Sequence, residues 1–503
     1  MDKIAVVDLG SSKIDLIMAS CLQEGNFAVF EDISENVKIV DDFDGEGMLR
    51  IARSNEAIEV LKMYRMICEV NKISNIVAVC SHSLKNLKNY RSFLDEIYNI
   101  CGFKFKILSQ DEELSALYTG VVNSLDMPKA IVFNISGGTV RILQYSRRNV
   151  LNKIELPFGT YSVAKLMEQA KSPEEACQLM TSKFKEELEK VEWLRNIEGE
   201  FNFVGVGNAF RNAGFLSRKM RKYPLDVEHN YVMTKSQFQN VYDLVKTLDV
   251  DKTKKIKGIS ADRSDVFASG ISMIKAIFDV CKFDDATVSL KGMNEGFIYS
   301  AVMPQTSEKP ISDLLGFSLD NIREFYDGDY DNSKQVSELA LILFRQLKVL
   351  HKLPRGYVKV LRIAASMYNC GQRIKFYDNE KNSFSIILNS EILGATHREM
   401  ILASFVSASQ TLSDFNLTEW VKYKELLVEE DLDAVRKLSL IIRLAKALDK
   451  THRNVVQDIS CDILGDSVIM KTIITLDASI EIREALKASQ DFVKVYKKTL
   501  EVL

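Results

Sequence analysis

The stretch that decides the fold is residues 4–12, IAVVDLGSS, near the start of the 503-residue chain. Its apolar run ends in Asp8 and Leu9 and is closed by a glycine- and serine-rich turn, which predicts a buried strand followed by a phosphate-sized turn. A second apolar run over residues 13–20 follows at once. The two runs are therefore predicted to pair as a β-hairpin.

Short apolar runs with strand character recur beyond this hairpin. They alternate with helical patterns, which predicts a mixed α/β protein. The strand-turn-strand unit at residues 129–145 has the layout of the first hairpin and indicates a weak internal repeat. The predicted strands are 75–80, 103–108, 129–135, 140–145 and 202–206, and the helical patterns include 55–70 and 172–195.

From about Gly316 the sequence pattern becomes mainly helical. Strand character returns at residues 467–476, and an amphipathic segment at 479–500 is predicted to pack a helix on that strand. The helical patterns of this half lie at 333–351, 357–367, 398–412 and 432–449.

Charge and cysteine content exclude several classes of protein. The formal net charge of −3 gives no overall attraction to nucleic acid or anionic lipid, so neither partner is expected. Eight cysteines without a CxxC pair fit a reducing compartment, and five histidines lack zinc-site spacing. No segment approaches the roughly 20 apolar residues that span a bilayer, and no basic N-terminal region precedes a long apolar stretch. We therefore expect a cytoplasmic protein.

Three glycine-rich turns at the ends of apolar strands are candidates for phosphate binding. Backbone N–H groups in such turns approach an anion closely and present several donors to it. Each turn alone is more often an ordinary tight turn, but open α/β folds place ligands at strand ends, so three together favour a phosphate site. They are Asp8-Leu9-Gly10-Ser11-Ser12, Asn134-Ile135-Ser136-Gly137-Gly138-Thr139 and Gly205-Val206-Gly207-Asn208.

Eleven segments form an ordered series over almost the whole chain. They are VVDLGSS at 6–12, CSHSLKNLKN at 80–89, ILSQDEELSALYTGV at 107–121, IVFNISGGTVRI at 131–142, IELPFGTYSV at 154–163, FVGVGNAFRNA at 203–213, ISADRSDVFASG at 259–270, NEGFI at 294–298, LFRQL at 343–347, LRIAASMYNCG at 361–371 and LIIRLAKALDKTHR at 440–453. This series resembles the successive signatures of the Ppx/GppA family of exopolyphosphatases and guanosine pentaphosphate phosphohydrolases.

The resemblance implies two actin-like, ribonuclease-H-like lobes facing each other across a cleft, then a helical HD-like domain and a small C-terminal α/β domain. It also implies a homodimer that removes the terminal phosphate of polyphosphate, or converts pppGpp to ppGpp, with a divalent metal. The predicted domains are 1–124 for lobe I, 125–308 for lobe II, 309–455 for the HD-like domain and 456–503 for the C-terminal domain.

The resemblance assigns roles to residues of this chain. Glu113 matches the general base on the attacking water, and Asp8 matches the first-strand acid that faces phosphate and metal. Taken alone, Glu113 would be an exposed acid in the first turn of a helix, and His82 a partner for an acid or a backbone carbonyl. The implied phosphate-binding residues are Asp8, Gly10, Ser11, Ser12, Lys85, Ser136, Gly137, Gly138, Thr139, Arg141, Gly205, Gly207 and Asn208.

The chain departs from the family pattern at the second turn. That motif normally reads Asp-Ile-Gly-Gly-Gly-Ser-Thr-Glu, whereas Asn134 and Arg141 replace both acids here. Hard divalent cations need anionic oxygen ligands, so metal binding is expected to be badly weakened, although an arginine can still bind phosphate directly. In the helical half, Tyr368-Asn369 stands where HD relatives have His-Asp, so no HD metal centre is expected.

These features favour a protein that binds polyphosphate or a guanosine polyphosphate in the interlobe cleft, with slow or lost hydrolysis. Mg²⁺ is the expected cofactor if hydrolysis survives, and none is expected otherwise. Two alternatives stay open. One is an active hydrolase that recruits Asp111, Glu112 or Asp15 as substitute carboxylates, and the other is a non-catalytic interaction protein whose helical half mediates assembly.

Overall fold

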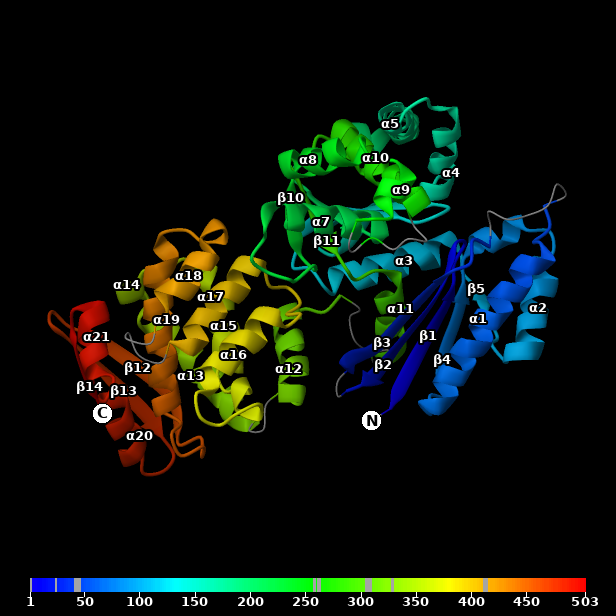
Figure 1. Ribbon diagram of the computed structural model, residues 1–503. Helices are drawn as coiled ribbons and strands as arrows, with labels where there is room; N and C mark the ends of the chain where they lie inside the picture. The colour runs from blue at the N-terminus through cyan, green and yellow to red at the C-terminus, as the bar shows by residue number, and fades with distance from the viewer. Residues whose placement is uncertain are drawn as a thin grey trace. The chain divides into compact units, whose positions relative to one another are not determined.

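The computed structural model describes residues 2–22, 25–39, 47–256, 259, 264–303, 310–326, 330–409 and 415–503. The chain forms two compact units, residues 1–223 with 228–312, and residues 224–227 with 313–503. Figure 1 shows most of the first unit in blue to green and the second mainly in yellow to red. Among the described helices, none is both long and apolar enough to cross a bilayer, and the eight cysteines are free thiols.

The first sheet is built on the predicted hairpin. Strands β1 (Lys3–Leu9) and β2 (Lys13–Cys21) pair antiparallel, as expected. Strand β3 (Phe27–Asn36) extends the sheet beyond β2, and β4 (Asn75–Cys80) and β5 (Lys106–Ile107) continue it in parallel on the other side of β1. The resulting order is β3-β2-β1-β4-β5.

Helices cover both faces of β1, which explains its uninterrupted apolar run. On one face, its residues pack with α1 (Ile51–Val70) and α2 (Tyr90–Cys101). On the other face, Ile4 and Val6 pack with α3 (Gln110–Val122) and α11 (Met293–Val302). The turn after β1 is therefore held by a strand that is buried from both sides.

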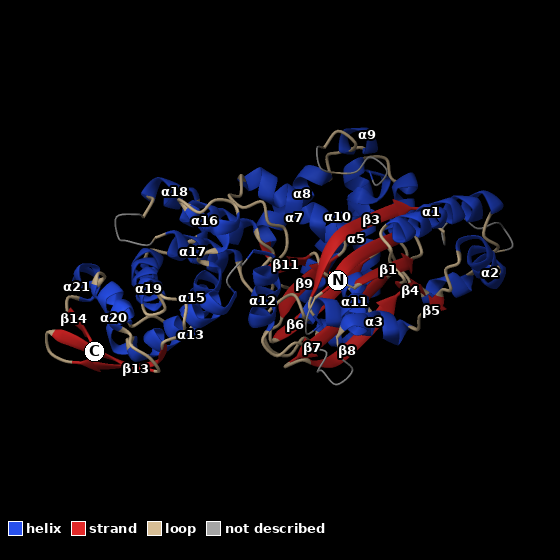
Figure 2. Ribbon diagram, turned by 90° about the horizontal axis from the view of Figure 1, so that it is seen from below, coloured by secondary structure: helices blue, strands red, loops and turns tan. Residues whose placement is uncertain are grey.

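The second sheet repeats the arrangement of the first, in the order β10-β11-β9-β6-β7-β8. A central hairpin, β6 with β7, has a third antiparallel strand beside β7 and a parallel strand beside β6 (Figure 2), so the predicted internal repeat is present. Helix α3 packs on one face, and α5 (Pro173–Glu189) and α10 (Ser264–Cys281) on the other. The strands are β6 (Lys129–Ile135), β7 (Val140–Ser146), β8 (Asn149–Leu156), β9 (Asn202–Val206), β10 (Tyr231–Thr234) and β11 (Asp285–Ser289).

The two hairpins carry equivalent residue pairs next to their turns. Asp8 pairs with Asp15 across β1 and β2, and Asn134 pairs with Arg141 across β6 and β7. Directly paired residues on antiparallel strands point to the same face of a sheet, with Cβ atoms about 5 Å apart. The first hairpin therefore presents two carboxylates where the second presents an amide and a guanidinium.

Glycines set a close approach between α3 and α11, the helices that lie between the two sheets (Figure 1). A Cβ added at Gly120 of α3 would lie 1.9 Å from the carbonyl oxygen of Gly292, and one at Gly296 of α11 would lie 1.9 Å from that of Ala116. No side chain fits between backbones at these distances, so the two helices depend on glycine at both points.

We expect Gly120→Ala to lower the free energy of unfolding by about 2 kcal/mol or more, because the methyl group forces α3 and α11 apart. Urea denaturation measures the loss. Gly356→Ala is the control, since a Cβ there meets nothing within 4 Å. Equal stability of the two variants would contradict the close helix contact.

The second unit is mainly helical, as predicted from residue 316 onward. Its helices include α12 (Leu314–Tyr326), α13 (Tyr330–Gln346), α15 (Tyr357–Met367), α16 (Asn379–Asn389), α17 (His397–Ala408) and α19 (Glu430–Ala447). Residues 410–412 of the helix predicted at 398–412 lie outside the described residues.

Three predicted helices are wrong in extent. The pattern at 333–351 ends as α13 at Gln346, and a short helix, α14 (Lys348–His351), follows. The pattern at 172–195 breaks after Glu189, and a short helix, α6 (Glu192–Arg195), follows. The segment at 479–500 forms α20 (Ser479–Leu486) and α21 (Ser489–Tyr496) and then enters a strand. That strand, β14 (Thr499–Val502), completes a sheet of order β12-β13-β14 with β12 (Val456–Ile463) and β13 (Ser467–Ile474).

Candidate functional site

A cavity of about 630 Å³ in the first unit opens between the turns of the two hairpins. It collects most of the residues that the sequence predicted to bind phosphate. Those that line it are Asp8, Gly10, Ser11, Ser12, Ser136, Gly137, Arg141, Gly207 and Asn208.

The two hairpin turns have matching backbone geometry and nearly touch. The N–H of Gly10 donates to the carbonyl of Lys13 (2.9 Å), and the N–H of Ser136 donates to that of Thr139 (3.0 Å). A Cβ added at Gly137 would lie 2.4 Å from Ser12 Oγ. A side chain at this position would therefore collide with the opposite turn, which explains why the second turn is rich in glycine.

The third turn places a helix N-terminus at the cavity. Gly207 has φ of +99°, and a Cβ there would lie 2.6 Å from the carbonyl oxygen of Ile135, so glycine is required. Helix α7 (Asn208–Arg221) starts at the next residue. Its first N–H groups and the positive end of its dipole favour an anion at this wall.

Several predicted residues lie outside the cavity lining. Lys85 is exposed on the short helix η2 (His82–Asn86), and Gly205 packs its backbone against the ring of Phe210. Thr139 is buried and bonds within its own turn, to Ser136 Oγ (3.1 Å between the two oxygens). Gly138 faces Ser11, whose Oγ would lie 3.0 Å from an added Cβ. These positions shape the turns or the surface.

Glu113, the predicted general base, is fully buried near the start of α3. Its Oε1 accepts a hydrogen bond from the N–H of His82 (3.1 Å). Its Oε2 accepts hydrogen bonds from Arg141 Nε (2.9 Å) and Nη2. Both carboxylate oxygens therefore already have donors, and Glu113 does not line the cavity.

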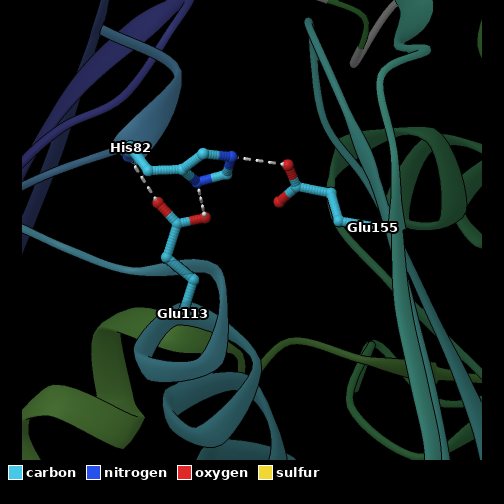
Figure 3. Close-up of side chains that lie close together, drawn as sticks. All are labelled: His82, Glu113 and Glu155. Atoms are coloured by element: carbon cyan, nitrogen blue, oxygen red, sulfur yellow. Dashed lines mark hydrogen bonds and ion pairs between the residues drawn. The ribbon is translucent and has the colours of Figure 1, made fainter. Parts of the chain in front are cut away.

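Arg141 binds a second buried acid, Glu155 of β8, with 2.9 Å between Nε and Oε2. His82 lies between the two glutamates, with Nε2 3.0 Å from Glu155 Oε1 and Nδ1 3.4 Å from Glu113 Oε2 (Figure 3). We call these four residues the ion-pair cluster. The expectation that His82 partners an acid is confirmed.

Burial raises the pKa of Glu155, whereas the charges of Arg141 and His82 act to lower it. Sequence reasoning missed Glu155, although it lies in a motif quoted for the family. The contact between Glu155 and Arg141 could have been predicted only from the strand pairing, because Glu155 stands directly opposite Arg141 on the neighbouring strand.

His82, Glu113 and Glu155 have ligand atoms within 4.8 Å of one another, a spacing that would suit a metal ion. However, the guanidinium of Arg141 is bound to both carboxylates. A divalent cation at this point would meet a fixed positive charge, and Asn134 adds no anionic oxygen. The residues present therefore do not fit the metal that the family pattern implies at the second turn.

The first hairpin carries two of the acids that line the cavity, Asp8 and Asp15. Asp8 and Asp15 are 6% and 3% exposed. Burial raises the pKa of Asp8 to about 7, and the negative charge of Asp15 adds to the shift. Lys13 Nζ lies 2.5 Å from Asp15 Oδ2, so Lys13 pairs with this acid while its side chain stays 37% exposed.

Comparison with known families finds two sequence matches along the chain. The profile described as the Ppx/GppA phosphatase family matches residues 20–304, and that of Ppx/GppA phosphatase domain III matches residues 317–486. A guanosine-5'-triphosphate,3'-diphosphate pyrophosphatase of Aeromonas salmonicida (strain A449) is 22% identical over 410 residues, 81% of this chain and 80% of the relative. One of Vibrio campbellii (strain ATCC BAA-1116) is 21% identical over 401 residues, 78% of each chain.

Solved structures show the same fold. A Ppx/GppA family member of Aquifex aeolicus has a TM-score of 0.52 at 22% identity, covering 61% of this chain and 99% of that one. An exopolyphosphatase from Cytophaga hutchinsonii has a TM-score of 0.55 at 17% identity, covering 60% and 98%. These matches, with the two repeated sheets, confirm the predicted actin-like fold of the first unit.

Proposed function

This chain belongs to the Ppx/GppA phosphatase family, and we propose that it binds polyphosphate or a guanosine polyphosphate in its cavity with slow or lost hydrolysis of the terminal phosphate. The observation that carries this proposal is the ion pair between Glu113 and Arg141, beside two hairpin turns with matching backbone hydrogen bonds. Binding and hydrolysis depend on different parts of the site, and only the part for binding is intact.

Anion binding is supported by three elements that meet at the cavity. The two hairpin turns offer backbone donors from opposite walls, and α7 directs its N-terminus at the same space. The relatives named as guanosine-5'-triphosphate,3'-diphosphate pyrophosphatases and as an exopolyphosphatase support these two ligand classes. Both classes carry phosphoanhydride chains, and several N–H donors in one cavity can bind the oxygens of such a chain.

Hydrolysis requires a carboxylate that can take a proton from water next to the terminal phosphorus. Glu113 would have to break its bonds to Arg141 before an attacking water could use it. Breaking a buried ion pair is strongly unfavourable, because it leaves an uncompensated charge. The proposal therefore predicts little turnover even with ligand bound.

Other properties of the family are part of the proposal. We expect a homodimer in the cytoplasm without nucleic-acid or membrane partners. The four-domain division at residues 124, 308 and 455 also stays a prediction, and the second of these boundaries lies outside the described residues.

Equilibrium binding tests the first half of the proposal. We expect micromolar binding of long-chain polyphosphate or pppGpp, and binding about tenfold weaker or worse in Gly137→Ala, whose methyl group would meet Ser12. Gly465→Ala is the matched control, because a Cβ there meets no atom within 4 Å. Failure of wild type to bind either ligand, or equal binding by both variants, would contradict a ligand site between the turns.

A further inference from the structure

We infer that Lys446, in the last turn of α19, is a nucleophilic lysine whose Nζ takes the acyl group of an acyl phosphate. The inference does not depend on the proposed function, because every residue that carries it belongs to the second unit. It assigns a site of covalent modification to the helical half of the chain, apart from the cavity and the ion-pair cluster.

The first observation is the setting of the Lys446 side chain. Its Nζ lies 4.8 Å from the centre of the Tyr368 ring, in a cation–π contact. Among the residues that the structure describes, no carboxylate forms an ion pair with this ammonium group. Lys446 is partly buried, so its charge has lost water and has gained an aromatic face in place of an anion. Such a setting disfavours the charged form of a lysine.

The second observation is the polar network that holds the ring. The hydroxyl of Tyr368 donates to Asn332 Oδ1, and Asn332 Nδ2 donates to Asp449 Oδ2 (2.7 Å). The other oxygen of Asp449 accepts a hydrogen bond from the N–H of Asn454 (3.1 Å). Asn332 and Asp449 are both buried. These bonds fix the ring beside Lys446, and they engage the carboxylate that follows Lys446 in the sequence with partners other than the lysine.

The third observation is the charge of the neighbouring side chains. Burial lowers the pKa of Lys446 to about 8, although the charge of Glu380 on α16 acts to raise it. The positive charges of Lys450 and Arg443 act in the same direction as burial. Tyr368 carries no charge at neutral pH. An appreciable fraction of Lys446 is therefore the free amine at neutral pH, and the free amine is the form that attacks a carbonyl carbon.

Loss of water and a neighbouring positive charge are the two conditions that make a lysine a nucleophile, and Lys446 meets both. The charge of the exposed Lys450 also favours an electrophile whose leaving group is an anion. With an acyl phosphate, the Nζ lone pair attacks the acyl carbon and forms an amide bond. The bond between the acyl carbon and the phosphate oxygen breaks, inorganic phosphate leaves with its electron pair, and the amine proton passes to water.

Acetyl phosphate added to the full chain tests the site, with the acetylation of each lysine followed by mass spectrometry of the digested protein. At about pH 7.5 we expect Lys446 to react about tenfold faster than the exposed Lys450 in the same sample. The rate at Lys446 should level off above about pH 8, whereas the rate at Lys450 should keep rising. In guanidinium chloride, which unfolds the chain, the two lysines should react at similar rates.

Two substitutions with opposite effects separate the electrostatic setting from a change in fold. Lys450→Met removes a repelling charge and should slow the acetylation of Lys446 about twofold or more. Glu380→Gln removes the opposing acid and should speed it by a similar factor. Lys471→Met, at an exposed position of β13, is the control and should leave the rate unchanged.

The inference is overturned if Lys446 reacts no faster than Lys450 in the folded chain, or if its advantage persists in guanidinium chloride. It is also overturned if Lys450→Met and Glu380→Gln do not shift the rate at Lys446 in opposite directions.

Discussion

The double substitution Asn134→Asp, Arg141→Glu is expected to raise Mg²⁺-dependent phosphate release from polyphosphate or pppGpp by at least about 100-fold over wild type. It frees Glu113 from the guanidinium and supplies two anionic ligands at paired positions of the second hairpin. A metal could then bind beside Glu113, where wild type holds Arg141. Release of inorganic phosphate under saturating substrate measures the gain.

Two controls define what the gain means. Glu113→Gln added to the double variant should abolish the new activity, because water would lose its base. Without Mg²⁺, the double variant gathers acids with no compensating cation, so its melting temperature should fall and then recover when Mg²⁺ is added. A stable double variant that remains silent with Mg²⁺ would show that the two substitutions are not what limits hydrolysis.

Arg141→Met is expected to lower the free energy of unfolding by about 3–5 kcal/mol at neutral pH, because it leaves buried acids without their cation. Arg141 is bound to both Glu113 and Glu155, which are fully and almost fully buried at their side chains. Chemical denaturation measures the loss. Lys153→Met is the control, since Lys153 pairs with exposed Asp111 and should contribute little.

The loss of unfolding free energy in Arg141→Met should become smaller as the pH falls. Burial already raises the pKa of Glu155, and Arg141 is the largest influence that lowers it, so the variant's Glu155 pKa should rise further. An acid whose pKa is higher in the folded than in the unfolded chain supports folding below its unfolded pKa and loses that support as pH rises through the folded pKa. A loss that stays constant between pH 5 and pH 8 would contradict the role of these carboxylates.

Strands with buried faces were predictable from sequence, and the edge strands β3 and β8 were not. The runs at 4–9, 75–80, 129–135 and 202–206 correspond closely to β1, β4, β6 and β9, because helices cover those strands. Strands β3 and β8 are largely exposed and about half polar, so their apolar residues do not form the long runs seen in the buried strands. Strand β5 (Lys106–Ile107) lies within the strand predicted at 103–108, so its position was predicted and its extent was wrong.

In the candidate site, too, some features could be predicted from the sequence and others could not. The glycine turns and the unusual residues Asn134 and Arg141 could be read from the sequence, since each lies within a recognisable motif. The ion pairs of Arg141 could not be predicted, because its partners Glu113 and Glu155 lie on α3 and on β8. Only strand pairing and the packing of the two lobes bring them together. The pairing of Asp8 with Asp15 likewise follows from hairpin register.

The measurement that tests the central claim most directly is phosphate release by wild type from polyphosphate and from pppGpp, with Mg²⁺ or Mn²⁺, beside equilibrium binding of the same ligands. The account predicts binding in the micromolar range with phosphate release near background, unchanged by Glu113→Gln. Rapid release by wild type that Glu113→Gln abolishes would contradict it, because Glu113 would then act as a base despite its ion pair with Arg141.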